Sequence, residues 1–246
     1  MAQVELPYIQ HHTFKKGEKL TYRVHYGLVN AAIASIEILD TTVMIGNRPS
    51  FHAVVKANTS GAFNSIYKVN DRYDSFIDEN ALVPWVFTRR TNEGGYVIHQ
   101  DYLFNQYKNR VKARRSGSGR KTYTDIIKDS LPPNIQDIFS VFYLFRTLNT
   151  EYMEVGDLQS FTAYFDEEVY PIQFRYVGKE FMKTIFGKVE CLVYVPVVQK
   201  GRVFKDENDL KIWVTNDKNK IPVRIEAELM VGSIKVDLDK AEHLAN

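Results

Sequence analysis

The chain has 246 residues, of which 44% are hydrophobic, and its 32 Lys and Arg against 30 Asp and Glu leave a net charge of +2. This hydrophobic content is enough for a packed core, which excludes a disordered chain. The near-neutral charge argues against nucleic acid as a partner, because nucleic-acid-binding surfaces concentrate basic residues. A single cysteine, Cys191, excludes an intramolecular disulfide framework.

Residues 1–17 are predicted to form an irregular N-terminal arm, because their apolar residues do not alternate. The arm lacks the apolar core that a signal peptide needs, so the chain as given has no signal peptide. No stretch of the chain is apolar for the length of about 20 residues that a transmembrane helix needs, so no transmembrane segment is predicted.

From Glu18 onward the apolar residues follow the two-residue period of half-buried strands. Leu20, Tyr22 and Val24 share one face of the first run, and a break at residues 27–30 predicts a hairpin. We expect about eight strands before residue 130 and about seven after residue 150, judged from this alternation. A turn at residues 178–179 is predicted to separate two of the later strands.

The segment Asn134–Thr150, NIQDIFSVFYLFRTLNT, is predicted to be one long helix. Two prolines precede it, and Asn134 can cap its free N–H groups. Ile138, Phe142 and Phe145 recur at helical spacing, while other apolar residues occupy much of the opposite face. Because a helix that is apolar nearly all round belongs inside a protein, we expect the strands to surround this one.

The predicted fold is therefore mainly β, as a single domain over residues 1–246. Strands in uninterrupted succession favour an antiparallel meander, since a parallel sheet would need crossover helices. We expect a large curved sheet, a half-barrel or an open barrel, packed around the one long buried helix.

Several segments together resemble a bacterial exported family of unknown function, number 3108 in the domain-of-unknown-function series. The first is FKKGEKLTYRVHYGLVNAAIASIEI, with a Gly-Glu-x-Leu-x-Tyr core, and the second is DRYDSFIDENALVPWVFTRR. The helix segment DIFSVFYLFRTL is similar to the family's helix through Asp137, Ser140, Tyr143 and Arg146, and two C-terminal hairpins complete a match over residues 14–238. One departure is visible, because residues 30–32 read Asn-Ala-Ala where the family has Gly-x-Ala.

This resemblance implies an exported protein, periplasmic or otherwise outside the cytoplasm, whose leader is missing from the given chain. It also implies a curved antiparallel sheet similar to the half-barrels of lipoprotein carriers, packed on a helix. It implies no established activity.

Motifs for catalysis are missing from the sequence. There is no Gly-x-Ser-x-Gly, and Cys191 lies in a strand pattern, which favours a small core residue. His25, His52 and His99 could converge on a metal from three strands, but their spacing matches no ligand motif, so separate roles are favoured. We therefore predict no catalytic residue, no metal and no cofactor, and favour a protein that is not an enzyme.

The densest basic run covers residues 108–115, and its alternate residues share one face of a strand. It could contact anionic headgroups or polysaccharide, but a solvated sheet face is favoured. Arg146 ends the apolar helix and is expected to be buried with a partner, either a strand carboxylate or carbonyls. Its alternative role is that of a polar anchor at the bottom of a binding groove.

A curved sheet that one helix covers incompletely leaves an apolar cleft, and such clefts are the usual ligand sites. The residues predicted to line it are Phe51, Phe63, Tyr67, Phe76, Trp85, Phe87, Arg146 and Trp213. The favoured hypothesis is a non-enzymatic cell-envelope protein that binds an apolar or amphipathic ligand, or an envelope protein, on the concave face. Its alternatives are a structural or assembly factor of the envelope that acts through protein contacts, and an enzyme with an unrecognised site.

Overall fold

The computed structural model describes residues 5–61, 63–197, 209–229 and 232–246. Over these residues the protein is mainly β-structure, with one large antiparallel sheet and two short α-helices. None of the helices in the described part of the chain has the length and apolar character needed to cross a membrane.

The elements before the central helix are β1 (Lys19–Tyr26), β2 (Val29–Ile38), β3 (Val43–Ile45), β4 (Arg48–Thr59), α1 (Phe63–Ile66), β5 (Val69–Asp78), β6 (Pro84–Glu93), β7 (Tyr96–Asn105), the 3-10 turn η1 (Gln106–Lys108), β8 (Arg110–Gly117) and β9 (Arg120–Lys128). The central helix is α2 (Ile138–Arg146). After it come β10 (Leu158–Phe165), β11 (Glu168–Thr184), β12 (Gly187–Pro196), β13 (Leu210–Thr215), β14 (Pro222–Glu228) and β15 (Ser233–Glu242).

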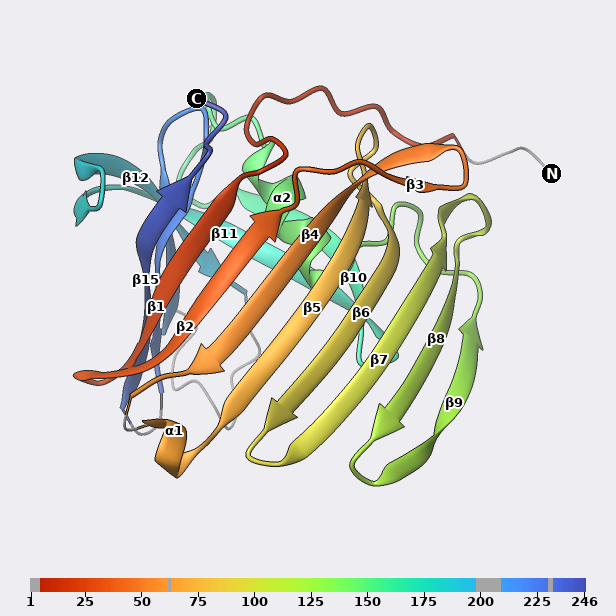
Figure 1. The fold of residues 1–246 in the computed structure, drawn as a ribbon. Coiled ribbons are helices and arrows are strands. Elements are labelled where there is room, and N and C mark those ends of the chain that lie inside the picture. The colour runs from red at the N-terminus through yellow and green to blue at the C-terminus, as the bar shows by residue number, and fades with distance from the viewer. Residues whose placement is uncertain (1–4, 62, 198–208, 230–231) are drawn as a thin grey trace.

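The sheet is an antiparallel meander whose strand order runs from β10 through β15 to β1 and then on to β9. The last strand, β15, pairs with the first, β1, so the two halves of the chain form one continuous sheet. Its two edges are β9 and β10, the strands on either side of the central helix in the sequence, and they do not pair to close a barrel. In Figure 1 the strands β1 to β9 form a broad curved wall, β10 and β11 lie behind it, and α2 lies between.

The prediction of a long helix over Asn134–Thr150 is wrong, because α2 has nine residues and begins only at Ile138. Asn134 has a φ of +56°, which a helix does not allow. Gln136 instead bridges to Ala163 of β10 and exchanges backbone hydrogen bonds with that strand. The segment before the helix is thus an extension of the sheet edge, and Asp137 takes the capping role predicted for Asn134.

The turn predicted at residues 178–179 is also wrong, because β11 runs through it as one strand of 17 residues. The pairing with β12 shifts register between Tyr176 and Gly178. Gly178 has a φ of +127°, a conformation that only glycine adopts readily, so it forms a bulge that bends the strand without ending it.

The core lies on the concave side of the sheet and around α2. One cluster joins Phe87, Tyr102 and Tyr164 with Phe139 of the helix. A second packs Phe145 against Tyr194. The helix therefore occupies the interior of the curved sheet, as its apolar pattern predicts.

Candidate ligand-binding cleft

Between α2 and the concave face of the sheet lies an apolar cavity of about 320 Å³. It is about twice as large as the ~150 Å³ of an engineered apolar cavity that binds benzene, and falls within the range of small-molecule sites. The sixteen lining residues are Tyr22, Ala34, Ser35, Ile36, Val55, Ile138, Phe139, Val141, Phe142, Phe145, Ile172, Phe174, Ile212, Pro222, Ile225 and Val236. Most of these side chains are only half buried, so the cavity is an open cleft.

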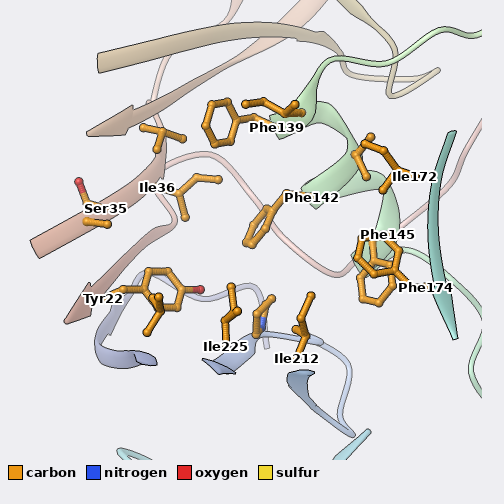
Figure 2. A pocket seen from close by; sticks show the side chains of 16 residues that line it. Tyr22, Ser35, Ile36, Phe139, Phe142, Phe145, Ile172, Phe174, Ile212 and Ile225 are labelled. Atoms are coloured by element: carbon orange, nitrogen blue, oxygen red, sulfur yellow. The ribbon is translucent and has the colours of Figure 1, made fainter. Parts of the chain in front are cut away.

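The helical wall of the cleft is formed by Phe139, Phe142 and Phe145, which recur every three residues and so lie on one side of α2. Figure 2 shows the three rings pointing from the helix toward the strands. Their pattern was visible in the sequence, but the spacing alone could not distinguish a core stripe from a cleft wall.

The opposite walls come from strands that are far apart in the sequence. Tyr22 and Ile36 project from β1 and β2, whereas Ile212 and Ile225 project from β13 and β14 (Figure 2). The pairing of β15 with β1 brings these strands into one sheet and thereby creates the cleft. These residues were not predicted as site residues, because alternation shows which residues share a face but not what that face contacts.

Only two lining residues, Tyr22 and Ser35, carry a polar group in their side chains. In Figure 2 the Tyr22 hydroxyl points toward the middle of the cleft, whereas the Ser35 hydroxyl points away from the other labelled side chains. The Tyr22 hydroxyl is buried and has no hydrogen-bond partner among the described residues. Because this oxygen is shielded from solvent, the accessible surface of the cleft is almost entirely apolar.

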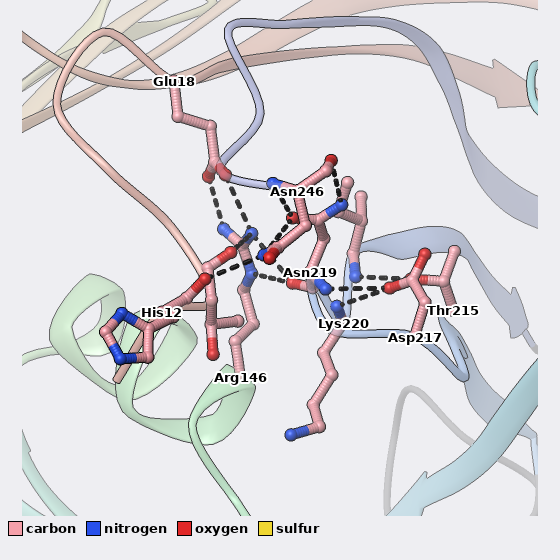
Figure 3. Close-up of polar contacts among 10 residues, drawn as sticks. His12, Glu18, Arg146, Thr215, Asp217, Asn219, Lys220 and Asn246 are labelled. Carbon is pink, nitrogen blue, oxygen red and sulfur yellow. Dashed lines mark hydrogen bonds and ion pairs between the residues drawn. The ribbon is translucent and has the colours of Figure 1, made fainter. Parts of the chain in front are cut away.

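The C-terminal end of α2 is fixed by Arg146, which is fully buried. Its guanidinium donates to both carboxylate oxygens of Glu18, at 2.5 and 3.0 Å, and to the backbone carbonyl of Asn219 (Figure 3). The same guanidinium lies 5.6 Å from the ring of Phe142, one of the lining residues. The ion pair thus holds one wall of the cleft in place.

The N-terminal end of α2 is fixed by Asp137, which caps the helix. Its carboxylate accepts hydrogen bonds from the backbone N–H groups of Phe139 and Ser140, both at 2.8 Å, and from the hydroxyl of Ser75 on β5 at 2.5 Å. Burial raises the pKa of the Asp137 carboxyl, although these hydrogen bonds act in the opposite direction. The helix is thus tied at its start to β5 and at its end to the residue that precedes β1.

None of the eight residues predicted to line the cleft is among those that line this cavity. Phe87 is buried and stacks on Tyr102 at 5.3 Å, and Phe51 is buried against Phe14 at 5.7 Å. Trp85 is buried and its ring N–H donates to Asp78 at 3.1 Å.

The other predicted residues are similarly dispersed. The ring N–H of Trp213 donates to Glu180 at 2.9 Å. Phe76 stacks on His52 at 4.2 Å, beside the hydrogen bond of 2.7 Å that joins His52 to Asp74. Phe63 is the first residue of α1 and is half buried, and Tyr67, which directly follows α1, is 48% exposed.

Arg146 is the exception among the eight, because it stands directly behind the cleft wall. The prediction that it is buried with a carboxylate partner is confirmed by Glu18. Whether any of the eight residues contacts a ligand stays a prediction.

The three strand histidines do not converge. His25, His52 and His99 lie on β1, β4 and β7, and the described residues include no group of three possible ligands that could hold a metal ion.

The basic residues between 108 and 115 form ion pairs with acidic side chains. Arg110 pairs with Asp129, while Lys112 and Arg114 pair with Asp125. These pairs are exposed, which fits the solvated sheet face favoured from the sequence.

The comparisons with known proteins agree with this architecture. The model of a family described as "Protein of unknown function (DUF3108)" matches residues 21–239. No curated protein has a matching sequence.

Among solved structures, a β-barrel-like protein of the domain of unknown function DUF1849 from Brucella abortus is similar, with a TM-score of 0.53 at 8% identity over 96% of this chain and 98% of that one. This likeness shows a shared fold alone. Two further structures align with 9% identity over 97% of this chain and 100% of theirs. One is described as a "putative exported protein with YmcC-like fold" from Bacteroides fragilis, and the other as a "putative lipoprotein" from Parabacteroides distasonis. Their TM-scores of 0.34 and 0.31 are too low to bear on the fold.

Proposed function

The chain belongs to the DUF3108 family, whose function is unknown, and on the geometry of the cleft we propose that this protein binds an apolar or amphipathic ligand without catalysing a reaction. The observation that carries the proposal is an apolar cleft that stays open although α2 and seven strands converge on it. A ligand that covers half-exposed Phe and Ile side chains in a concave site removes them from water. This burial stabilises the complex by about 25 cal/mol per Å² of apolar surface.

The buried contacts at the two ends of α2 support the same proposal. Asp137 and Arg146 fix the two ends of α2 with buried polar contacts, so the position of the helical wall relative to the strands is fixed. A helix free to shift could close such a gap by packing onto the sheet. A pre-formed cleft lowers the cost of binding, because less has to be ordered when the ligand enters.

Action outside the cytoplasm is part of the proposal, and the resemblance of the chain to an exported family supports it. Fractionation of cells that express the natural gene product tests this part. Recovery in the envelope or periplasmic fraction is the expected result, and recovery in the cytoplasm would contradict it.

The binding proposal is tested by titrating a fluorescent fatty acid into the protein and into two variants on one strand. Ala34→Trp fills the cleft from β2, whereas Ile33→Trp places the same ring on the adjacent residue, which is 50% exposed and does not line the cleft. We expect Ala34→Trp to weaken binding at least tenfold and Ile33→Trp to leave it unchanged. The proposal fails if the unmodified protein binds no probe, or if the two variants bind equally well.

A further inference from the structure

One end of the sheet carries exposed apolar side chains that come from different parts of the chain. Leu28, in the turn between β1 and β2, is fully exposed, and Ile66, at the end of α1, is 76% exposed. The turn and α1 both lie at the lower end of the sheet in Figure 1. The rings of Tyr26 and Phe63 contact each other with their centres 6.2 Å apart, so the two segments are neighbours.

Charged residues are missing from the sequence around both segments. Residues 26–36 include none and residues 57–67 include none, although a quarter of the chain is charged. Single exposed apolar residues are common on protein surfaces, but two neighbouring segments without any charge form a surface that water solvates poorly. We call residues 26–29 and 63–67 the apolar tip, and infer that it is suited to contact with an apolar phase.

The cleft opens toward the same end of the sheet. Along the inner face of β1, burial falls from Leu20, which is fully buried, through Tyr22 of the cleft to Tyr26, which is 39% exposed. On β4 the buried Ala53 is followed on the same face by Val55, which lines the cleft and is only half buried. The cleft is therefore closed at the end away from the apolar tip and open toward it.

We propose that the apolar tip docks the protein onto the surface of a lipid bilayer, with Leu28 and Ile66 inserted among the acyl chains, and that the cleft takes up or releases its ligand there. The docking is a separate property of the tip, whereas the exchange of ligand rests on the proposed function. Water solvates an apolar ligand poorly, so a cleft that opens beside a bilayer receives the ligand without a passage through water.

The shape of the apolar tip favours a bilayer over a protein partner. Leu28 projects from its turn, and a side chain at the neighbouring Gly27 would meet open space. A protein interface needs closely complementary surfaces, whereas fluid acyl chains pack around a projecting side chain of any shape. Tyr26 and Tyr67 flank the projecting residues, and tyrosine is enriched at the level of lipid headgroups because it is apolar with a polar end.

Co-sedimentation with vesicles of phosphatidylcholine tests the docking. These vesicles have no net charge, so attraction between basic residues and anionic lipid does not contribute. We expect the unmodified protein to bind them, and Leu28→Glu and Ile66→Glu each to weaken binding about tenfold, because a charge replaces an apolar side chain that the acyl chains bury. Met44→Glu is the matched control and should bind as the unmodified protein does, because Met44 is 56% exposed on β3, at the opposite end of the sheet (Figure 1).

A fluorescent label shows which end of the sheet meets the lipid. Cys191 is fully buried, and burial raises the pKa of its thiol to about 11, so a thiol-reactive dye labels only an introduced cysteine. A polarity-sensitive dye on Leu28→Cys should shift its emission to the blue when vesicles are added, and the same dye on Met44→Cys should not. Equal shifts at the two positions, or vesicle binding that Leu28→Glu leaves intact, would overturn the inference.

The fatty acid titration, made without vesicles, separates the docking from the proposed function. Leu28 and Ile66 do not line the cleft, so Leu28→Glu and Ile66→Glu should bind the fatty acid as the unmodified protein does. Binding of the fatty acid without binding of vesicles would refute the docking alone, and the reverse result would refute the proposed function alone. A dimer that Leu28→Glu dissociates would assign the apolar tip to a second copy of the chain and would also refute the docking.

Discussion

Arg146 at the end of α2 and Glu18 immediately before β1 form a bidentate ion pair, although they lie 128 residues apart in the chain. Their side chains are 0% and 1% exposed. The pair crosses from the central helix to the strand where the two halves of the sheet meet, and further bonds from Arg146 reach the carbonyls of Thr13 and Asn219 (Figure 3). Loss of one partner would leave a buried charge alone.

The first prediction concerns this pair. Arg146→Met should lower the free energy of unfolding by about 3–5 kcal/mol, because the Glu18 carboxylate would remain buried without its cation. Urea denaturation measures the change. The double variant Glu18→Leu, Arg146→Met removes both charges and should recover part of the loss.

The exposed pair of Arg23 with Asp239 provides the control, since its side chains are both 45% exposed. Arg23→Met should cost less than about 1 kcal/mol. Similar losses for Arg23→Met and Arg146→Met would show that burial does not set the strength of the Arg146 pair.

The second prediction concerns the pH dependence that Asp137 contributes. Its pKa is raised in the folded protein, so the folded state holds the proton more tightly than the unfolded state does. Its contribution to stability is therefore fully present below the unfolded pKa and is lost as the pH rises through the folded pKa. Asp137→Asn keeps a capping oxygen but cannot ionise.

Relative to the unmodified protein, the free energy of unfolding of Asp137→Asn should therefore rise between acid and neutral pH. Urea denaturation from the acid range to pH 7 measures the difference. A difference that falls as the pH rises would contradict the direction assigned to this carboxyl.

The third prediction concerns the stability cost of the Tyr22 hydroxyl. Tyr22→Phe removes a buried polar group that has no partner among the described residues, so the free energy of unfolding should rise by up to about 1 kcal/mol. Tyr164→Phe should act in the same direction, because the same group is removed from a similar environment. Thermal melting without ligand measures both, and a clear loss of stability in Tyr22→Phe would reveal a partner for its hydroxyl.

The fourth prediction concerns the turn between β10 and β11, which is tied to the inner face of the sheet. Asp166 accepts hydrogen bonds from Arg89 of β6 at 3.3 Å and from Gln100 of β7 at 3.1 Å. Asp166→Asn tolerates the left-handed φ of 45° at this position but removes the charge. Amide exchange at the start of β11 should become faster by an amount equivalent to less than about 1 kcal/mol, since Asp166 is 41% exposed.

Glu168→Gln is the control for this turn, because the partner of Glu168 is the exposed hydroxyl of Tyr170. It should leave amide exchange unchanged. High salt should reduce the difference between Asp166→Asn and the unmodified protein, and a difference independent of salt would argue against an ionic tie.

Much of the architecture follows from the sequence, since its signals are local. The alternation around Leu20 and Tyr22 predicts a strand with one apolar face, and the structure has β1 there with both residues buried. A helical stripe that ends in an arginine predicts a buried helix with a paired guanidinium, and Arg146 is paired with Glu18. Each inference needs only the spacing of neighbouring residues and the cost of burying a charge.

The tertiary structure decided the helix boundary, the continuity of β11 and the position of the cleft. Gln136 leaves the helical pattern because β10, which follows it in the sequence, offers backbone groups that pair with its own. The cleft joins Tyr22 to Ile225 only because β15 pairs with β1. Periodicity identifies which residues share a face, whereas the surface opposite that face depends on long-range strand pairing, which leaves no local signal in the sequence.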